Sequence, residues 1–385
     1  MSEILHISYD LRDRFNRDIT TAVKNLIEIT SQLNETKVID LVRVIKFNDE
    51  FIQADSPNHL KVNCFGMPFG IFHLLSQRRA FNKILKASNN GLIDLKSIRL
   101  IHSHKLTFEG YIGYLLSRKL GKPLIITLRQ TDIYVLSKRI DLISNFKKVL
   151  KYSSKIIYLI PSMKKEIHKI VGNNFFYNHI ESKLQFLPNI VERQIANENI
   201  NFIPGNFLTI LRMTKESVKR KNIKNLFKAI IPLKENHIKL IIIGDGNYLW
   251  KVKEWIKKFD LTEIVELIGN VPNDKIDKYY VKAEAFLLPS KSESFGMVYA
   301  EALLNGTPIM YTKDALGFDG IFENVGVGVH AGSVNSITEG IKILRKKNPL
   351  FRETISNLRD NNELNIFSAK YIQRTYSQII KGLLN

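Results

Sequence analysis

The stretch AFLLPSKSESFGMVYAEALLNGTPIM, residues 285–310, decides how this chain folds. An apolar segment ends at Pro289, a short polar loop follows, and a helical pattern begins near Phe295 and Gly296. A strand that turns through a polar loop into a helix is the repeating unit of parallel α/β folds. The first amides of such a helix have no partner within it, and a glycine lets an anion approach the backbone. We therefore expect a phosphate site at Gly296.

Two glutamates flank this helix start. Glu293 lies just before the turn, and Glu301 lies one helical turn after Met297 on the same face. A carboxylate accepts hydrogen bonds from a vicinal diol such as ribose. Two carboxylates around a phosphate site therefore suit a nucleotide sugar, with Glu293 on the sugar and Glu301 on the ribose. The alternative, a solvated helix with surface acids, does not explain the loop with its glycine.

The whole stretch resembles the Glu, seven residues, Glu motif of retaining GT-B glycosyltransferases, specifically the large family 4 group. The similarity extends over Leu-Pro-Ser, Glu301-Ala302 and Gly306-Thr307-Pro308. A pair of glutamates at this spacing is common in helices, so the longer string carries the resemblance. It implies that Glu293 is catalytic and that the donor is bound by Glu293, Ser294, Phe295, Gly296, Met297 and Glu301.

A basic group follows the first strand expected in the second half of the chain. The segment ILRMTKESVKRKNIKNLFKAI places Arg212 at the strand end and Arg220 and Lys221 at the start of the next helix. By the same resemblance these three side chains bind the donor diphosphate, and Arg212 and Lys221 stabilise it as it leaves. The resemblance also implies a tight turn at Gly244 below the donor and contacts of the nucleobase with Asn270 and Val271.

The first half of the chain resembles the family less closely. The segment LIHSH, residues 100–104, resembles the family's His-x-His, and Arg129 stands where a later family motif has histidine. A permanent cation there replaces a titratable ring. We expect His104 to be the catalytic histidine instead, with His104, Arg129 and Asp132 on the acceptor side. A purely structural role for His104 stays open as the alternative.

Apolar runs rich in Ile, Val and Leu alternate with helical patterns along the chain, which is typical of repeated strand and helix units. We predict an α/β protein of the GT-B kind, with two Rossmann-like domains whose parallel sheets face a central cleft. The expected parts are an acceptor domain at 1–188, a linker at 189–205, a donor domain at 206–366 and a C-terminal helix at 367–385 that packs back on the first domain.

The composition of the 385 residues narrows the class of protein. No apolar run is long enough to span a bilayer, and the first residues carry charges where a signal peptide needs an apolar block. The single cysteine, Cys64, cannot form an internal disulfide. We expect a cytoplasmic protein.

The net charge of +20 calls for an anionic partner. Residues 71–86, IFHLLSQRRAFNKILK, alternate apolar and basic residues at helical spacing. This pattern indicates contact with an anionic membrane surface, peripheral on the inner face of the membrane. A basic solvated face over an ordinary core stripe is the alternative interpretation.

These features together predict a retaining hexosyltransferase that moves a sugar from a nucleotide diphosphate sugar to a glycan or lipid-linked acceptor, in cell-surface polysaccharide or glycolipid synthesis. We expect no metal, because Asp-x-Asp is absent from the sequence and cationic groups with helix dipoles can neutralise the diphosphate. A sugar-nucleotide epimerase or a glycan phosphorylase of similar architecture is the alternative. A basic nucleic-acid-binding protein is less favoured, because no recognised binding module is present, and we expect no nucleic acid partner.

Overall fold

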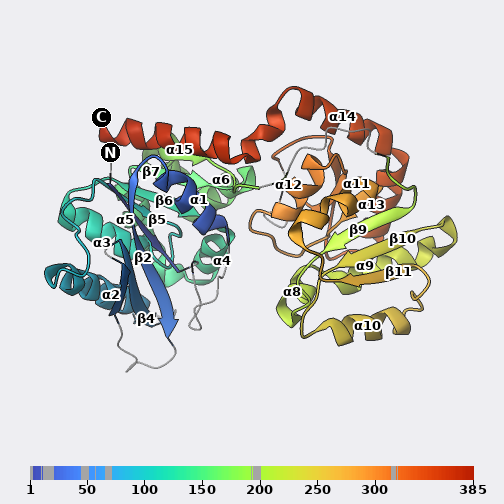
Figure 1. Ribbon diagram of the computed structural model, residues 1–385, viewed down its shortest axis with the longest axis horizontal. Helices are drawn as coiled ribbons and strands as arrows, with labels where there is room; N and C mark the ends of the chain where they lie inside the picture. The colour runs from blue at the N-terminus through green and yellow to red at the C-terminus, as the bar shows by residue number, and fades with distance from the viewer. Residues whose placement is uncertain are drawn as a thin grey trace. The chain divides into compact units, whose positions relative to one another are not determined.

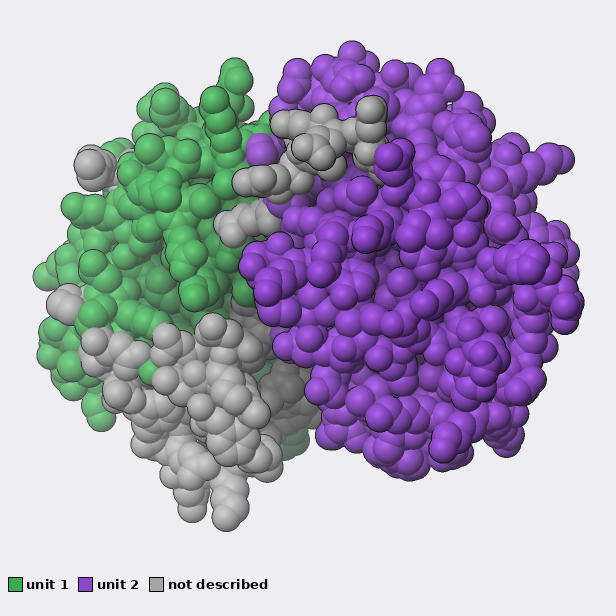
Figure 2. Space-filling view, turned by 45° about the vertical axis from the view of Figure 1, so that its right-hand side comes forward, with its two compact units in different colours: residues 1–190, 369–385 green, residues 191–368 purple. Residues whose placement is uncertain are grey.

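The computed structural model describes residues 3–9, 11, 21–44, 52–56, 58–65, 72–191, 193, 201–313, 318 and 320–385. The chain forms two compact units, Met1–Ile190 with Ala369–Asn385 and Val191–Ser368 (Figures 1 and 2). The first unit is thus assembled from two stretches that are far apart in the sequence. Residues 191–205, which the sequence assigned to a linker, group with the second unit.

The first unit contains an eight-stranded sheet in the order β3-β4-β2-β1-β5-β6-β7-β8. Every neighbouring pair is parallel except β3 and β4 at one edge, which are antiparallel. The strands are β1 (Glu3–Ser8), β2 (Glu35–Val44), β3 (Ile52–Ser56), β4 (His59–Phe65), β5 (Leu100–Ser103), β6 (Leu124–Leu128), β7 (Lys155–Tyr158) and β8 (Leu184–Phe186).

Helices from both ends of the chain cover this sheet. They are α1 (Thr21–Ser31), α2 (Phe72–Asn89), α3 (Gly110–Leu120), α4 (Gln130–Lys138), α5 (Ile143–Tyr152), α6 (Pro161–Val171), α7 (Asn173–His179) and α15 (Ala369–Leu384). Helix α15 lies beside α1, where Gln373 donates a hydrogen bond to the Ile29 carbonyl at 2.8 Å. Its apolar side, including Ile372 and Tyr376, packs into the core with Ile4 and Leu100.

The second unit contains a six-stranded parallel sheet in the order β11-β10-β9-β12-β13-β14. Its strands are β9 (Asn206–Ile210), β10 (Lys239–Ile243), β11 (Val265–Gly269), β12 (Ala285–Leu287), β13 (Ile309–Thr312) and β14 (Gly326–Val329). Its helices are α8 (Lys215–Arg220), α9 (Ile223–Ile230), α10 (Leu249–Lys258), α11 (Asp277–Lys282), α12 (Met297–Leu304), α13 (Val334–Lys346) and α14 (Asn348–Asp360). Apolar side chains from strands and helices form one buried core.

Each sheet has a point where the strand order reverses. In the first unit β1 and β5 are neighbours, and in the second unit β9 and β12 are neighbours. Successive connections diverge from such a switch point, which leaves a crevice at the carboxyl ends of the two strands. Residues that follow β1, β5, β9 and β12 are therefore the first candidates for binding.

Candidate functional site

The loop after β12 ends at a glycine that no other residue can replace without strain. Gly296 precedes α12 with a φ of 75°, in the left-handed region. A Cβ at this position would lie 2.4 Å from the Tyr299 ring and 3.1 Å from Cγ of Glu293. Among the described residues, none accepts a hydrogen bond from the N–H of Met297 or Val298. This geometry leaves two amides for an anion at the switch point of the second unit.

Lys221 and Glu293 form an ion pair at the same switch point. Lys221 Nζ donates to Oε2 of Glu293, and about 11% of each side chain is exposed. The prediction that Arg220 and Lys221 begin a helix is wrong, because α8 ends at Arg220 and α9 begins at Ile223. Lys221 lies between them, and its N–H donates to the Ser217 carbonyl at 2.7 Å. The break between the helices thus directs the ammonium group toward the loop after β12.

Glu301 lies on α12 with its carboxylate only partly exposed. Tyr280 on α11 donates a hydrogen bond to Glu301 Oε2 at 2.9 Å. The Tyr280 hydroxyl has a pKa well above its usual value of 10, chiefly because of burial and also because of the nearby Glu301 charge. The hydroxyl therefore stays protonated and keeps donating to the carboxylate. Sequence reasoning missed Tyr280, which has no place in the local motif.

The other predicted donor residues of the second unit differ in exposure. Arg212 and Arg220 are exposed, Asn270 is exposed, and Val271 is partly exposed after β11. Gly244 brings two loops together, because a Cβ there would lie 1.8 Å from the Leu211 carbonyl oxygen.

Phe295 and Ser294 complete the loop before Gly296. Phe295 is buried, and its ring centroid lies 5.9 Å from that of Phe367. Ser294 and Met297 are partly exposed. The Phe295 side chain therefore anchors the loop in the core, while Ser294 stays partly exposed.

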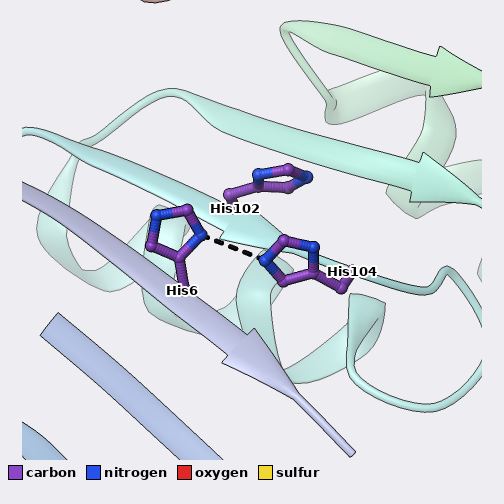
Figure 3. Close-up of side chains that lie close together, drawn as sticks. All are labelled: His6, His102 and His104. Carbon is purple, nitrogen blue, oxygen red and sulfur yellow. Dashed lines mark hydrogen bonds between the residues drawn. The ribbon is translucent and has the colours of Figure 1, made fainter. Parts of the chain in front are cut away.

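Three histidines gather at the switch point of the first unit (Figure 3). His6 lies on β1, His102 lies on β5, and His104 follows β5. His6 Nδ1 and His104 Nε2 are 3.0 Å apart, and the ring centroids of His102 and His104 are 4.1 Å apart. The His102 ring also hydrogen bonds with the hydroxyls of Tyr376, at 2.7 Å, and Thr127, at 2.8 Å.

This cluster is uncharged. Burial lowers the pKa of His6 to about 3. Burial also lowers the pKa of His102 and His104 well below 6.5, and the neighbouring histidines and Arg129 add to this effect. One nitrogen from each neutral ring lies within 4.8 Å of the others, as metal ligands do, but both ring nitrogens of His102 already have hydroxyl partners. The contacts of the described residues therefore favour a hydrogen-bonded array over a metal centre.

His104, Arg129 and Asp132, predicted on the acceptor side, are brought together. Arg129 Nε donates to the His104 carbonyl at 3.0 Å, and the Arg129 N–H donates to Asp132 Oδ2 at 2.8 Å. Asp132 Oδ1 accepts from the N–H and the hydroxyl of Thr107. Burial raises the pKa of Asp132, and these hydrogen bonds oppose the rise. Asp132 thus caps the start of α4 through Oδ2 and ties it to Thr107 through Oδ1, and Arg129 lines a narrow pocket beside Thr127 and Pro188.

Helix α2 exposes the apolar and basic side chains that the sequence singled out. Phe72 and Leu75 are 64% and 44% exposed, and Arg78 and Lys86 are exposed too. The opposite side of α2 is buried against the rest of the first unit, where the His73 ring lies 2.7 Å from the Thr107 carbonyl oxygen. Ile71, the first residue of the predicted segment, lies outside the described residues. Of the helices that the structure describes, none is long and apolar enough to cross a membrane.

Known proteins resemble both the second unit and the whole fold. Residues 198–361 match the family described as glycosyl transferases group 1. An uncharacterized glycosyltransferase of Methanocaldococcus jannaschii is 28% identical over 62% of this chain and 63% of its own length. The alpha-monoglucosyldiacylglycerol synthase of Streptococcus pneumoniae is 26% identical over 55% of this chain and 46% of its own length. The chain spans about half to two thirds of the length of these curated relatives.

Solved structures share the architecture of the entire chain. HepE of Anabaena, in complex with UDP, has a TM-score of 0.67 at 15% identity, and the match covers 100% of both chains. At this identity the likeness establishes the fold. The switch-point corner, the family match over residues 198–361 and the curated relatives agree that the second unit is similar to the glycosyl transferases group 1, and the whole chain has the GT-B fold.

Proposed function

We propose that this chain transfers a hexose from a nucleoside diphosphate sugar to an acceptor hydroxyl, with retention of anomeric configuration, as a member of family 4. One observation supports this above all. In the part of the chain that the structure describes, the Lys221 and Glu293 pair lies beside the loop that leads into α12, where the amides of Met297 and Val298 have no acceptor, at the switch point of the second unit. A cation, a carboxylate and free amides are the groups that a sugar diphosphate requires.

The donor diphosphate competes for Lys221 in this mechanism. The amides at α12 bind phosphate oxygens, and Lys221 turns from Glu293 to the diphosphate, joined by Arg212 and Arg220. Glu293 then accepts hydrogen bonds from sugar hydroxyls. The bond between the anomeric carbon and the diphosphate oxygen breaks, the acceptor oxygen bonds to that carbon, and the acceptor proton passes to the departing diphosphate. The cationic side chains stabilise the charge that develops, and no metal is required.

The rest of the donor is assigned to residues around the same corner. Glu301 accepts hydrogen bonds from the ribose, and the nucleobase contacts the backbone at Asn270 and Val271. On the acceptor side we retain Arg129, which lines the narrow pocket. His104 and Asp132 are enclosed, so we assign them the positioning of Arg129 in place of contact with the acceptor.

The acceptor is proposed to be a glycan or a lipid-linked saccharide of the cell surface. The name of the Streptococcus pneumoniae relative specifies a glycolipid product, which favours the lipid-linked class. The exposed Phe72, Leu75, Arg78 and Lys86 of α2 suit an anionic membrane surface on the cytoplasmic side.

The test begins with thermal-shift screening of UDP-, GDP- and ADP-linked sugars against the purified chain. The donor that stabilises the chain is then supplied with a labelled sugar and a lipid extract as acceptor, and the anomeric configuration of the product is read by NMR. We expect a glycoside of the donor's configuration. An inverted product contradicts the retaining mechanism. An altered sugar nucleotide formed without acceptor, or a sugar phosphate formed from glycan and phosphate, supports the epimerase or the phosphorylase alternative.

A further inference from the structure

The structure gives Glu301 a second neighbour on a distant part of the chain. Arg193 Nη2 lies 3.5 Å from Glu301 Oε2, the same oxygen to which Tyr280 donates. Arg193 Nη2 also donates to the side chain of Asn273 at 2.7 Å, and Nη1 lies 3.4 Å from Oδ1 of Asp277. Only 4% of the Arg193 side chain is exposed, compared with 15% for Glu301. A buried guanidinium with this many partners has one orientation.

These contacts leave one carboxylate oxygen for a ligand. In the part of the chain that the structure describes, Oε1 of Glu301 accepts no hydrogen bond, whereas Oε2 has both protein neighbours. A free glutamate side chain loses rotamer freedom when it binds, and this loss weakens the affinity. Here the loss has already occurred on folding, because Tyr280 and Arg193 fix the carboxylate through Oε2.

Arg193 is carried by the segment that begins the second unit. Two residues earlier, the Val191 N–H donates to the Phe367 carbonyl at 3.0 Å, and the Phe367 ring packs against Phe295 beside Gly296. The segment is therefore tied to the same loop and helix that form the phosphate site. The hydrogen bond from Val191 to Phe367 and the packing of Phe367 on Phe295 thus fix the segment relative to α12.

We propose that Arg193 is a positioning residue for the ribose diol of the donor nucleotide, acting through Glu301. The proposal rests on the proposed function, which assigns the ribose to Glu301. Arg193 orients Oε1 toward the diol. Its positive charge offsets the negative charges of the two carboxylates that it pairs with, Glu301 and Asp277. Its loss affects recognition of the ribose hydroxyls and leaves recognition of the diphosphate unchanged.

The test compares a nucleotide with its 2′-deoxy form by calorimetry. The probe is whichever of UDP, GDP and ADP binds the unmodified chain most tightly. We expect Arg193→Gln to weaken the ribonucleotide about tenfold and the 2′-deoxynucleotide less than twofold. Arg193→Lys, which keeps the charge but cannot reach all of the partners, should give an intermediate loss and remains measurable if Arg193→Gln fails to fold. Arg345→Gln is the control, because Arg345 also pairs with a carboxylate of the second unit, Glu284, at 3.6 Å.

A double-variant cycle separates this proposal from the one on which it rests. Glu301→Gln should itself remove the preference for the ribonucleotide, and Arg193→Gln should then add no further loss. If Glu301→Gln leaves the preference intact, the ribose assignment in the proposed function is wrong. If Glu301→Gln removes it but the Arg193 variants bind both nucleotides as before, or weaken both equally, only the role of Arg193 is overturned.

Discussion

At the switch point of the second unit, Lys221 and Glu293 are charged and slightly exposed, whereas at that of the first unit His6, His102 and His104 are neutral and fully enclosed. The same topology thus carries two kinds of polar chemistry. Because solvent reaches the Lys221–Glu293 ion pair, Lys221 can exchange its carboxylate partner for an anionic ligand. A buried array of neutral rings cannot gain a proton without a loss of stability. Its hydrogen bonds therefore stay in place and hold the strand ends in one arrangement.

The largest effect should come from the charged corner. We expect Glu293→Ala or Lys221→Ala to lower turnover by about a hundredfold or more, because in the proposed mechanism each removes a group that acts on the departing diphosphate or on the sugar. Steady-state rates with the identified donor measure this effect. Glu254→Ala is the control, since Glu254 pairs with Lys251 on the exposed face of α10. Turnover within threefold of normal in both variants would remove the assignment.

Breaking a buried pair also destabilises a protein, by about 3–5 kcal/mol when one charge is left alone. The double variant Lys221→Met with Glu293→Gln separates the two effects. It should recover stability in urea melts and stay inactive.

A smaller effect is expected at Gly296. Gly296→Ala places a Cβ 2.4 Å from the Tyr299 ring on a left-handed backbone, which should cost about 1–3 kcal/mol in the free energy of unfolding. We also expect donor affinity to fall about tenfold, because the amides of α12 shift. Calorimetry and urea melts measure both quantities. The control is Gly382→Ala in α15, where a Cβ meets nothing within 4 Å. If Gly296→Ala and Gly382→Ala had the same free energy of unfolding and the same donor affinity, Gly296 would not be required for the phosphate site.

The neutral cluster predicts a pH dependence of stability. His6 has a pKa of about 3 in the folded chain and about 6.5 when unfolded, so the unfolded chain binds more protons below pH 6.5. Stability should therefore be full above pH 6.5 and fall toward pH 5, by about 1.4 kcal/mol per pH unit for each such histidine. Urea melts at pH 7, 6 and 5 measure the slope, which His6→Asn should reduce. A flat profile would show that the cluster is open to protons in the folded state.

The smallest effect concerns α2. Arg78→Gln removes one exposed charge and should weaken binding to vesicles that contain anionic phosphatidylglycerol by about 1 kcal/mol, roughly fivefold. Co-sedimentation at fixed salt measures the binding, and Lys258→Gln on α10 is the control. Equal binding of the unmodified chain to neutral phosphatidylcholine vesicles, or preferential binding to duplex DNA, would contradict an anionic membrane as the partner.

The charged corner could be predicted from the sequence because most of it is continuous. The residues from Glu293 to Glu301 lie within one loop and one helix, and only Lys221, 72 positions before Glu293, had to be inferred through the family resemblance. The parallel sheets were also predicted, since parallel strands read as unbroken apolar runs. Strand β14 does not stand out as such a run, because its sequence GVGV has little strand propensity. Only glycine fits at position 326, because a Cβ there would lie 1.9 Å from the Ile309 carbonyl oxygen.

The histidine cluster could not be predicted in the same way. His6 and His104 are 98 residues apart, and His102 and Tyr376 are 274 residues apart. No local pattern marks contacts of this kind, because they depend on strand order and on where α15 packs. Arg193 escaped notice for the same reason, since its partners at Asn273, Asp277 and Glu301 become neighbours only after the second unit has folded.

The return of α15 to the first unit has a consequence for biosynthesis. Domains generally fold in the order in which the ribosome makes them. Here residues 191–368 are available as a continuous stretch before Ile372 and Tyr376, which fill the core of the first unit, have been translated. The unit that is begun first is thus finished last, and until then its sheet presents an uncovered apolar surface to chaperones.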